Sequence, residues 1–232
     1  MSDERRSAGL EGKQRQGSGV GYGVRVALPI GVAVGAFGIS FGVLARAEGL
    51  GILAPLVMSL TTFSGASQFA IVSVLKDGGG IGAAATAAIL LVARYLPIGV
   101  SVAPAIRGGV LARFARSQFV VDESWAVSNR GNGTFDGGTL LGAGLTIYLC
   151  WFAGTVLGVL GGDFLGDPED FGLDAAFAGL FLALLWTTLR SRRAVVAAAV
   201  GAVVALVLVP FTEPGIPIIA AGLGCLAGWR RG

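Results

Sequence analysis

Charged residues are missing from several stretches of this chain that are each long enough to cross a lipid bilayer. The uncharged runs cover residues 26–45, 49–75, 137–162 and 194–212, and they contain 20, 27, 26 and 19 residues. A helix needs about 20 apolar residues to cross the hydrocarbon core. The runs are continuously apolar rather than alternating, which favours helices over a membrane β-barrel. The sequence therefore predicts a helical protein that crosses a membrane several times.

The composition leads to the same fold class. Hydrophobic residues make up 54% of the 232 residues and charged residues only 13%, whereas an ordinary soluble domain carries about 25% charged residues. So much apolar side chain cannot be buried inside a soluble domain of this size. Glycine accounts for 39 residues, which is typical of helices that pack closely in lipid.

Three further stretches are less uniform than these runs. Residues 78–106 are apolar apart from Arg94, while residues 175–189 and 214–229 form uncharged runs of 15 and 16 residues. With them, the sequence predicts an all-α fold, a polytopic membrane helix bundle of six or seven segments that forms a single domain over residues 25–230.

The charges between these segments predict their orientation, but the two halves of the chain disagree. The links 107–136 and 190–193 are basic and are predicted to be cytoplasmic, whereas the link 163–171 is acidic and is predicted to lie outside. The polar residues 1–24, which we expect to form a disordered tail, carry basic residues, yet three spans would place them outside. Either the tail does lie outside and there are seven segments, or the run 49–75 enters and leaves on one face.

A short internal match relates the two halves of the chain. Residues 38–44 and 154–160 agree at four of seven positions, and they lie 116 residues apart, which is half the chain length. Three segments in each half, over residues 25–106 and 138–212, plus a final C-terminal helix would make an inverted repeat, a common transporter plan. Chance similarity in a sequence rich in Gly, Val and Leu is the alternative.

Four small residues, Gly31, Gly35, Gly38 and Gly42, lie close to one face of the first predicted helix. A spacing of about four between small residues permits close contact between helix backbones. We expect these glycines at a helix–helix contact; the alternative is a substrate path lined by bare backbone.

Arg94 is the charge that most needs an explanation. It is preceded by 16 uncharged residues and followed by 12 more. A charge at mid-bilayer costs roughly 2.5–3.5 kcal/mol even on insertion scales, so we expect Arg94 to face an interior cavity. A guanidinium is a planar fork that matches a carboxylate, which predicts that Arg94 binds an anionic group of a substrate. A structural ion pair and snorkelling to the interface are the alternatives.

A polar, glycine-containing string near the middle of the run 49–75 is the second candidate. Gly65 permits an unwound backbone, and an unwound helix at mid-membrane exposes amides and carbonyls that can hold both ends of a zwitterion. The predicted substrate-binding residues in this string are Ser64, Gly65, Ser67 and Gln68. The alternative is a small-residue helix crossing in which Gln68 hydrogen-bonds between helices.

Two neighbouring acids, Asp122 and Glu123, lie in the basic link 107–136. One interpretation is that they are solvated acids on a cytoplasmic amphipathic segment. The other is that they form a gate or coupling site, or supply a carboxylate partner for Arg94.

Several classes of function are excluded by what the sequence lacks. It has no His, and its two cysteines, Cys150 and Cys225, lie inside apolar runs. We therefore expect no metal site, no cofactor and no His-based catalysis. There is no phosphate-binding Gly-x-x-x-x-Gly-Lys-[Ser/Thr] loop, and a net charge of only +3 makes a nucleic acid a poor candidate partner.

Several of these strings resemble the AzlC family of branched-chain amino acid exporters. The most specific is Phe-Ser-Gly-Ala-Ser-Gln-Phe-Ala at residues 63–70. The resemblance continues in order at residues 41–45, 49–50, 58–59, 94, 101–104, 122–126, 172–174, 177 and 180–181. Where the family usually carries Asn-x-Arg-His in its third segment, this chain has Val92-Ala93-Arg94-Tyr95, so the Arg is kept and the Asn and His are not.

The resemblance implies a multi-pass protein of the bacterial plasma (inner) membrane that exports branched-chain or related hydrophobic amino acids. It also implies a small AzlD-like membrane subunit as partner, and a secondary transporter rather than an enzyme. Without an ATP-binding motif, the energy source is an ion gradient, the membrane potential or another chain. The competing hypotheses are a non-transporting membrane subunit of a larger transport complex, and a membrane enzyme built on Asp122 and Glu123.

Overall fold

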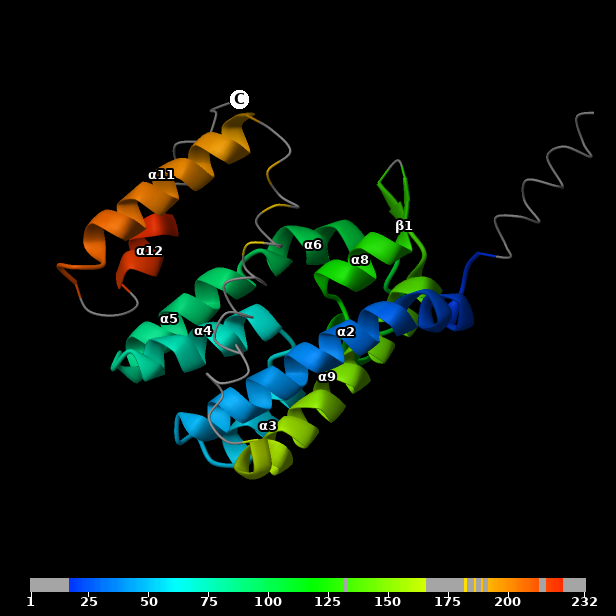
Figure 1. Cartoon of the computed structure of the whole chain (residues 1–232). Coiled ribbons are helices and arrows are strands. Elements are labelled where there is room, and N and C mark those ends of the chain that lie inside the picture. Colours follow the sequence, from blue (N-terminus) through cyan, green and yellow to red (C-terminus); the bar gives the residue numbers. More distant parts are fainter. Residues whose placement is uncertain are drawn as a thin grey trace, which may run out of the picture. The chain divides into compact units, whose positions relative to one another are not determined.

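The computed structural model of the chain describes residues 17–131, 133–165, 192–212 and 216–222, together with residues 182, 186 and 189. This part of the chain is mainly helical (Figure 1). The helices are α2 (Val20–Ala47), α3 (Leu53–Thr61), α4 (Gly65–Lys76), α5 (Ile81–Val92), α6 (Tyr95–Val102), α7 (Val110–Ser117), α8 (Asp122–Ser128), α9 (Gly137–Leu165), α11 (Arg192–Leu208) and α12 (Ile216–Gly222). A short antiparallel hairpin joins α8 to α9; its strands are β1 (Asn129–Gly131) and β2 (Thr134–Phe135).

The predicted class, a helical membrane protein, is confirmed. Three described helical stretches are long and apolar enough to cross a membrane: Val20–Ala47, Ile81–Val102 and Gly137–Gly162. The number of segments and the repeat arrangement remain predictions, because the acidic link, the run 175–189 and the end of the last segment lie largely or wholly outside the described residues.

The start of the first helix differs from the sequence-based expectation. We expected a tail through residue 24, whereas α2 begins at Val20. The charge of Arg25 suggested a later start, but one charge within the first turns of a long helix does not prevent helix formation, since Arg has a high helix propensity. Residues 1–16 of the predicted tail lie outside the described residues.

The chain divides into two compact units, each made of two separate stretches. The first holds the chain up to Ile39 and the stretch Arg94–Thr155; the second holds Ser40–Ala93 and the chain from Val156 onward. The divisions inside α2 and α9 fall after residues 39 and 155, which are 116 apart, the same offset as the matching strings. Because α2 and α9 pack side by side and in parallel, with Gly23 beside Thr139 and Gly38 beside Trp151, a division across both helices falls at paired positions. The shared offset therefore does not test the predicted repeat.

In the first unit, α2 packs closely against α9 through small residues (Figure 1). A Cβ placed on Gly31 would lie 3.0 Å from Cys150 Sγ, and one on Gly35 would lie 3.1 Å from the Cys150 carbonyl oxygen. A Cβ on Gly38 or Gly154 would overlap the backbone of the facing helix. For Gly31, Gly35 and Gly38, the predicted helix–helix contact is therefore confirmed.

Asp136 determines where α9 begins and ties it to the start of α2. Its Oδ1 accepts hydrogen bonds from the backbone N–H of Gly19 (2.8 Å) and Thr139 (2.9 Å), and its Oδ2 lies 3.0 Å from Nη2 of Arg130. Burial acts to raise the pKa of Asp136, but these hydrogen bonds and the Arg130 charge together lower it. The carboxylate thus stays ionised at the helix start, where an anion is favoured.

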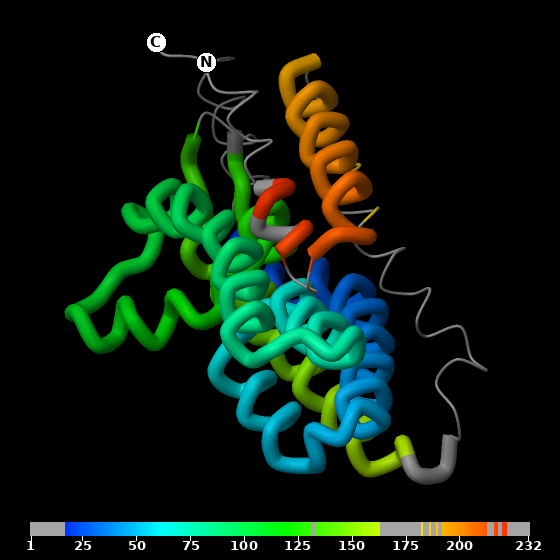
Figure 2. Tube along the Cα trace, turned by 90° about the vertical axis from the view of Figure 1, so that its left-hand side faces the viewer, coloured from blue at the N-terminus to red at the C-terminus, as the bar shows by residue number. Residues whose placement is uncertain are grey.

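The second unit contains a small apolar core between α4 and α5, which lie side by side (Figure 2). Its fully buried members are Ala70 and Val74 of α4 with Ala84 and Ala87 of α5. Alanine on the facing helix allows the two backbones to approach, so that the larger α4 side chains fill the space between them. Helix α12 contacts both α11 and α5 in the same unit.

We predict that Gly154→Ala destabilises the protein by about 1–3 kcal/mol, the usual cost of overpacking a tight contact. The added methyl group would meet the carbonyl oxygen of Gly35 and force α2 away from α9. The measurement is thermal unfolding of the purified protein in detergent. Gly21→Ala in α2 is the matched control, because a Cβ there meets nothing within 4 Å. Equal melting temperatures for the two variants would contradict the prediction.

Candidate functional site

The long run 49–75 does not form one helix. Helix α3 has 9 residues and α4 has 12, so each is too short to cross the hydrocarbon core. Between them the chain leaves helical geometry, with Ser64 extended at φ −150° and ψ 94°. The predicted unwinding next to Gly65 is therefore confirmed; whether the segment crosses or returns to the same face stays a prediction.

The side chain of Gln68 hydrogen-bonds to the backbone at this break. Its side chain is 0% exposed. Its Nε2 donates to the carbonyl oxygens of Met58 (3.1 Å) and Thr62 (2.6 Å), and its Oε1 accepts from Ser59 Oγ (3.3 Å). The Met58 carbonyl also accepts from the Thr62 N–H at 2.8 Å, and the Thr62 carbonyl also accepts from the Ser64 N–H at 2.7 Å. The amide thus gives each carbonyl at the end of α3 a second hydrogen bond, where lipid would offer none. The hydrogen-bonding role considered for Gln68 is thus confirmed, while substrate binding by its amide remains a prediction.

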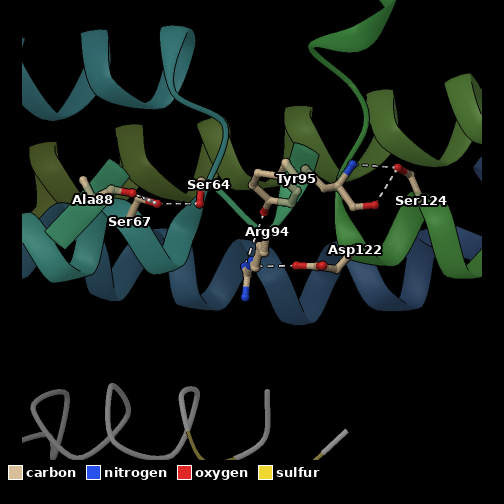
Figure 3. Close-up of polar contacts among 8 residues, drawn as sticks. Ser64, Ser67, Ala88, Arg94, Tyr95, Asp122 and Ser124 are labelled. Atoms are coloured by element: carbon tan, nitrogen blue, oxygen red, sulfur yellow. Dashed lines mark hydrogen bonds and ion pairs between the residues drawn. The ribbon is translucent and has the colours of Figure 1, made fainter. Parts of the chain in front are cut away.

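Two buried serines connect the break to the neighbouring helix. Ser64 Oγ and Ser67 Oγ are 2.9 Å apart, and Ser67 Oγ donates to the carbonyl oxygen of Ala88 in α5 at 3.3 Å (Figure 3). Ser64 is 3% exposed and Ser67 is 0% exposed. Gly65, the first residue of α4, follows the extended Ser64 directly. The four predicted residues thus lie together at the break in the second unit, where Ser64, Ser67 and Gln68 are buried and Gly65 is half-buried.

A second break interrupts the apolar stretch Ile81–Val102 at Arg94. Helix α5 ends at Val92 and α6 begins at Tyr95, with Ala93 and Arg94 in a turn between them. Pro97 explains this position, because proline has no N–H to donate to the carbonyl four residues earlier and its ring crowds that carbonyl. Ending α5 early places Pro97 in the first turn of α6, where proline is tolerated.

Arg94 forms an ion pair within the first unit. Its Nη2 lies 3.0 Å from Asp122 Oδ2, and the same nitrogen donates to the Tyr95 hydroxyl at 3.4 Å (Figure 3). The Arg94 and Asp122 side chains are each 33% exposed. Arg94 Nε is buried and has no hydrogen-bond partner among the described residues. The carboxylate partner considered for Arg94 is therefore confirmed, and one guanidinium donor is left over.

Helix α8 holds Asp122 in place. Ser124 Oγ accepts from the Val121 N–H at 2.9 Å, which fixes the start of the helix, and it donates to the carbonyl oxygen of Phe119 at 3.0 Å. Trp125 Nε1 donates to Ser101 Oγ in α6 at 2.9 Å. Two hydrogen-bonded anchors thus set the position of the first turn of α8 relative to the break at Arg94.

Glu123 follows Asp122 in the first turn of α8. Burial raises the pKa of the Glu123 carboxyl, and the Asp122 charge acts in the same direction. A backbone hydrogen bond and the Arg94 charge oppose this rise without cancelling it. The two predicted acids therefore differ: Asp122 is the partner of a guanidinium, whereas Glu123 has an increased affinity for a proton.

Two residues beside the site were not among the predicted ones. Tyr95 occupies the position where the resembled family usually carries His, and Ser101 links α6 to α8. A cavity of about 330 Å³ lies next to Tyr95, lined also by Gly99, Arg113 and Phe114. The available signal for Tyr95 was its place directly after a charged residue in an apolar run.

The described residues contain no group of three or more His, Cys, Asp or Glu that could hold a metal ion. Apolar spans, two interrupted helices and an ion pair at one of the interruptions are typical of membrane transport proteins.

The comparisons with known proteins agree with this class. The family described as "AzlC protein" matches residues 29–165. An "Uncharacterized membrane protein" of Archaeoglobus fulgidus is 33% identical over 218 residues, which cover 89% of this chain and 93% of that protein. "Inner membrane protein YgaZ" of Escherichia coli is 26% identical over 219 residues, or 88% of this chain and 87% of that protein. No solved structure matches. The chain belongs to the AzlC family of transport-related membrane proteins.

We predict that Gln68→Leu destabilises the protein by about 1–3 kcal/mol, because it removes the hydrogen bonds that the fully buried amide makes with Met58, Thr62 and Ser59. Thermal unfolding in detergent measures the change. Thr86→Val is the control, since its hydroxyl binds an exposed helical carbonyl, that of Gly82. A Gln68→Leu protein as stable as Thr86→Val would show that the amide does not hold the break.

Proposed function

We propose that this protein is a secondary transporter that exports branched-chain or related hydrophobic amino acids across a bacterial inner membrane. The observation that carries the proposal is the buried Nε of Arg94, which has no hydrogen-bond partner within the described part of the chain. A buried guanidinium donor without a partner has a high affinity for an anionic acceptor, and a carboxylate matches its planar fork. We assign the carboxylate of the amino acid to Arg94.

Asp122 and the substrate carboxylate would compete for the same guanidinium. With Asp122 3.0 Å from Nη2, a substrate carboxylate that accepts from both Nε and an Nη donor loosens this ion pair. Breaking the pair when substrate binds therefore makes Asp122 the gate in our proposal.

Glu123 is the acid that we assign to coupling. The pKa of its carboxyl is already raised by burial, and Arg94 is one of the charges that oppose the rise. When a substrate carboxylate neutralises Arg94, this opposition weakens and proton uptake by Glu123 becomes more favourable. Substrate and proton therefore bind together in this proposal, so export follows the outward gradient of the substrate itself and is modulated by pH rather than driven by an inward proton gradient.

The location and the partner are parts of the same proposal. The relative YgaZ is named an inner membrane protein, which supports a multi-pass location in that membrane. The small AzlD-like subunit is proposed from the family resemblance. Reconstitution of this chain with and without such a subunit separates a transporter from a non-transporting subunit: export by the complex that does not respond to changes at Arg94 would favour the latter.

We predict that Arg94→Ala reaches the membrane in normal amounts but abolishes amino acid efflux from loaded vesicles. Arg94→Lys keeps the charge without the planar fork, so we expect efflux to fall by at least tenfold. Arg25→Gln is the matched control, because Arg25 is an exposed arginine on α2. Normal efflux from Arg94→Ala vesicles would refute the assignment.

We predict that Glu123→Gln removes part of the pH dependence of export. The folded-state pKa of Glu123 is raised, so its protonated form persists above the ordinary value of about 4.3 and declines as pH rises through the raised pKa. Wild-type export should fall over this interval, and that of Glu123→Gln should stay flat. Glu48→Gln, at the end of α2, is the control. Identical pH profiles for wild type and Glu123→Gln would exclude Glu123 from coupling.

A further inference from the structure

Helix α7 (Val110–Ser117) has no buried residue, although one of its faces is strongly apolar. Val110 is 88% exposed, Leu111 81% and Phe114 76%. At 100° per residue these three side chains fall within one third of the helix circumference. Three large apolar side chains on one face, all exposed, indicate a contact with an apolar environment outside this chain.

The opposite side of α7 is basic. At 100° per residue Arg116 lies opposite the centre of the apolar face, and Arg113 lies between Arg116 and Val110. An apolar face combined with a basic face is typical of a helix that lies in the interface of a membrane, with arginines toward anionic headgroups.

The position of α7 along the chain fits this placement. The apolar stretch Ile81–Val102 ends just before it, and the next one, Gly137–Gly162, follows it. The link from Val102 to Val110 can extend at most about 30 Å, so α7 stays close to the end of a membrane span. With 8 residues, α7 is too short to cross the bilayer itself.

A basic cavity of about 540 Å³ lies beside α7 in the same unit. Its lining includes Arg107, Arg116, Asp136 and the first two residues of α9, Gly137 and Gly138. Arg116 Nη1 donates to the carbonyl oxygen of Arg107, which holds the two arginines together. The Asp136 carboxylate already accepts hydrogen bonds from Gly19 and Thr139 and forms an ion pair with Arg130. Its negative charge is therefore not available to neutralise Arg107 and Arg116.

We propose that α7 lies in the membrane interface and that Arg107 and Arg116 hold the phosphate of an anionic phospholipid in this cavity. Two arginines suit a phosphate group because each guanidinium offers several donors in a fixed plane. Free inorganic phosphate shares this chemistry. The lipid is favoured because the apolar face of α7 gives its acyl chains a surface that a free ion would not need.

The first test measures thermal stabilisation of the full chain in detergent. We expect phosphatidylglycerol to raise the melting temperature and phosphatidylcholine not to do so. The double variant Arg107→Gln/Arg116→Gln should lose at least half of the shift, whereas Arg113→Gln, which removes a cation of α7 outside the cavity lining, should keep it.

Three results of this test would overturn the proposal. A loss in Arg113→Gln equal to that in the double variant would mean attraction by diffuse surface charge. A shift of the same size with millimolar inorganic phosphate would mean a site for the free ion. Equal shifts with both lipids, or none, would mean that the cavity does not select an anionic phospholipid.

The second test measures where α7 lies relative to the membrane, and its result does not depend on the cavity. A spin label is attached in Phe114→Cys or, on the opposite face, in Ala112→Cys, with Cys150 and Cys225 replaced by Ser. In phosphatidylglycerol vesicles we expect oxygen, which concentrates in lipid, to reach the label at residue 114 more readily, and a water-soluble nickel chelate to reach residue 112. The reverse pattern, or a residue 114 protected from both reagents as in a protein–protein contact, would overturn the interfacial placement.

Discussion

The constraint on which this structure depends is that lipid offers no hydrogen bonds to a backbone that leaves helical geometry. The chain does so between α3 and α4, inside a run of 27 uncharged residues. The buried amide of Gln68 donates hydrogen bonds to two backbone carbonyls at this break, and Ser67 hydrogen-bonds the same region to α5. The broken segment is therefore a closed arrangement of hydrogen bonds, which allows irregular backbone within an apolar protein.

A similar constraint applies to the charge of Arg94, because lipid offers it no counter-ion. Pro97 ends α5 at the point where the guanidinium occurs, and α8 brings Asp122 to within 3.0 Å of it. Removing one partner of a partly buried ion pair leaves an uncompensated charge, which is costly. The structure shows this ion pair in its internally paired state, and its replacement by a pair with a ligand is the physical basis of the proposed gate.

The close contact between α2 and α9 is a further constraint within the first unit. Gly35 and Gly154 face each other so closely that a single methyl group would not fit. Asp136 ties the beginnings of the two helices together. The long helices α2 and α9 are thus held together through glycine, while the predicted polar site residues lie at or between the shorter helices α3 to α8.

The sequence alone determined the membrane class, the long helices α2 and α9 and the break beside Gly65, and it identified Arg94 as a lone charge in an apolar stretch. Long uncharged runs, the spacing of small residues and a single charge are local signals, and they are strong because lipid tolerates few charges and no unpaired backbone. The start of α2 was misplaced because a single Arg near a helix end costs little. Only the tertiary structure decided that Asp122, 28 residues along the chain from Arg94, is its partner, and that Gln68 turns inward to the end of α3. Both pairings depend on how α8 and α4 pack against their neighbours. The sequence pattern shows which residues are polar, but it does not show which of them the folded chain brings within hydrogen-bonding distance of each other.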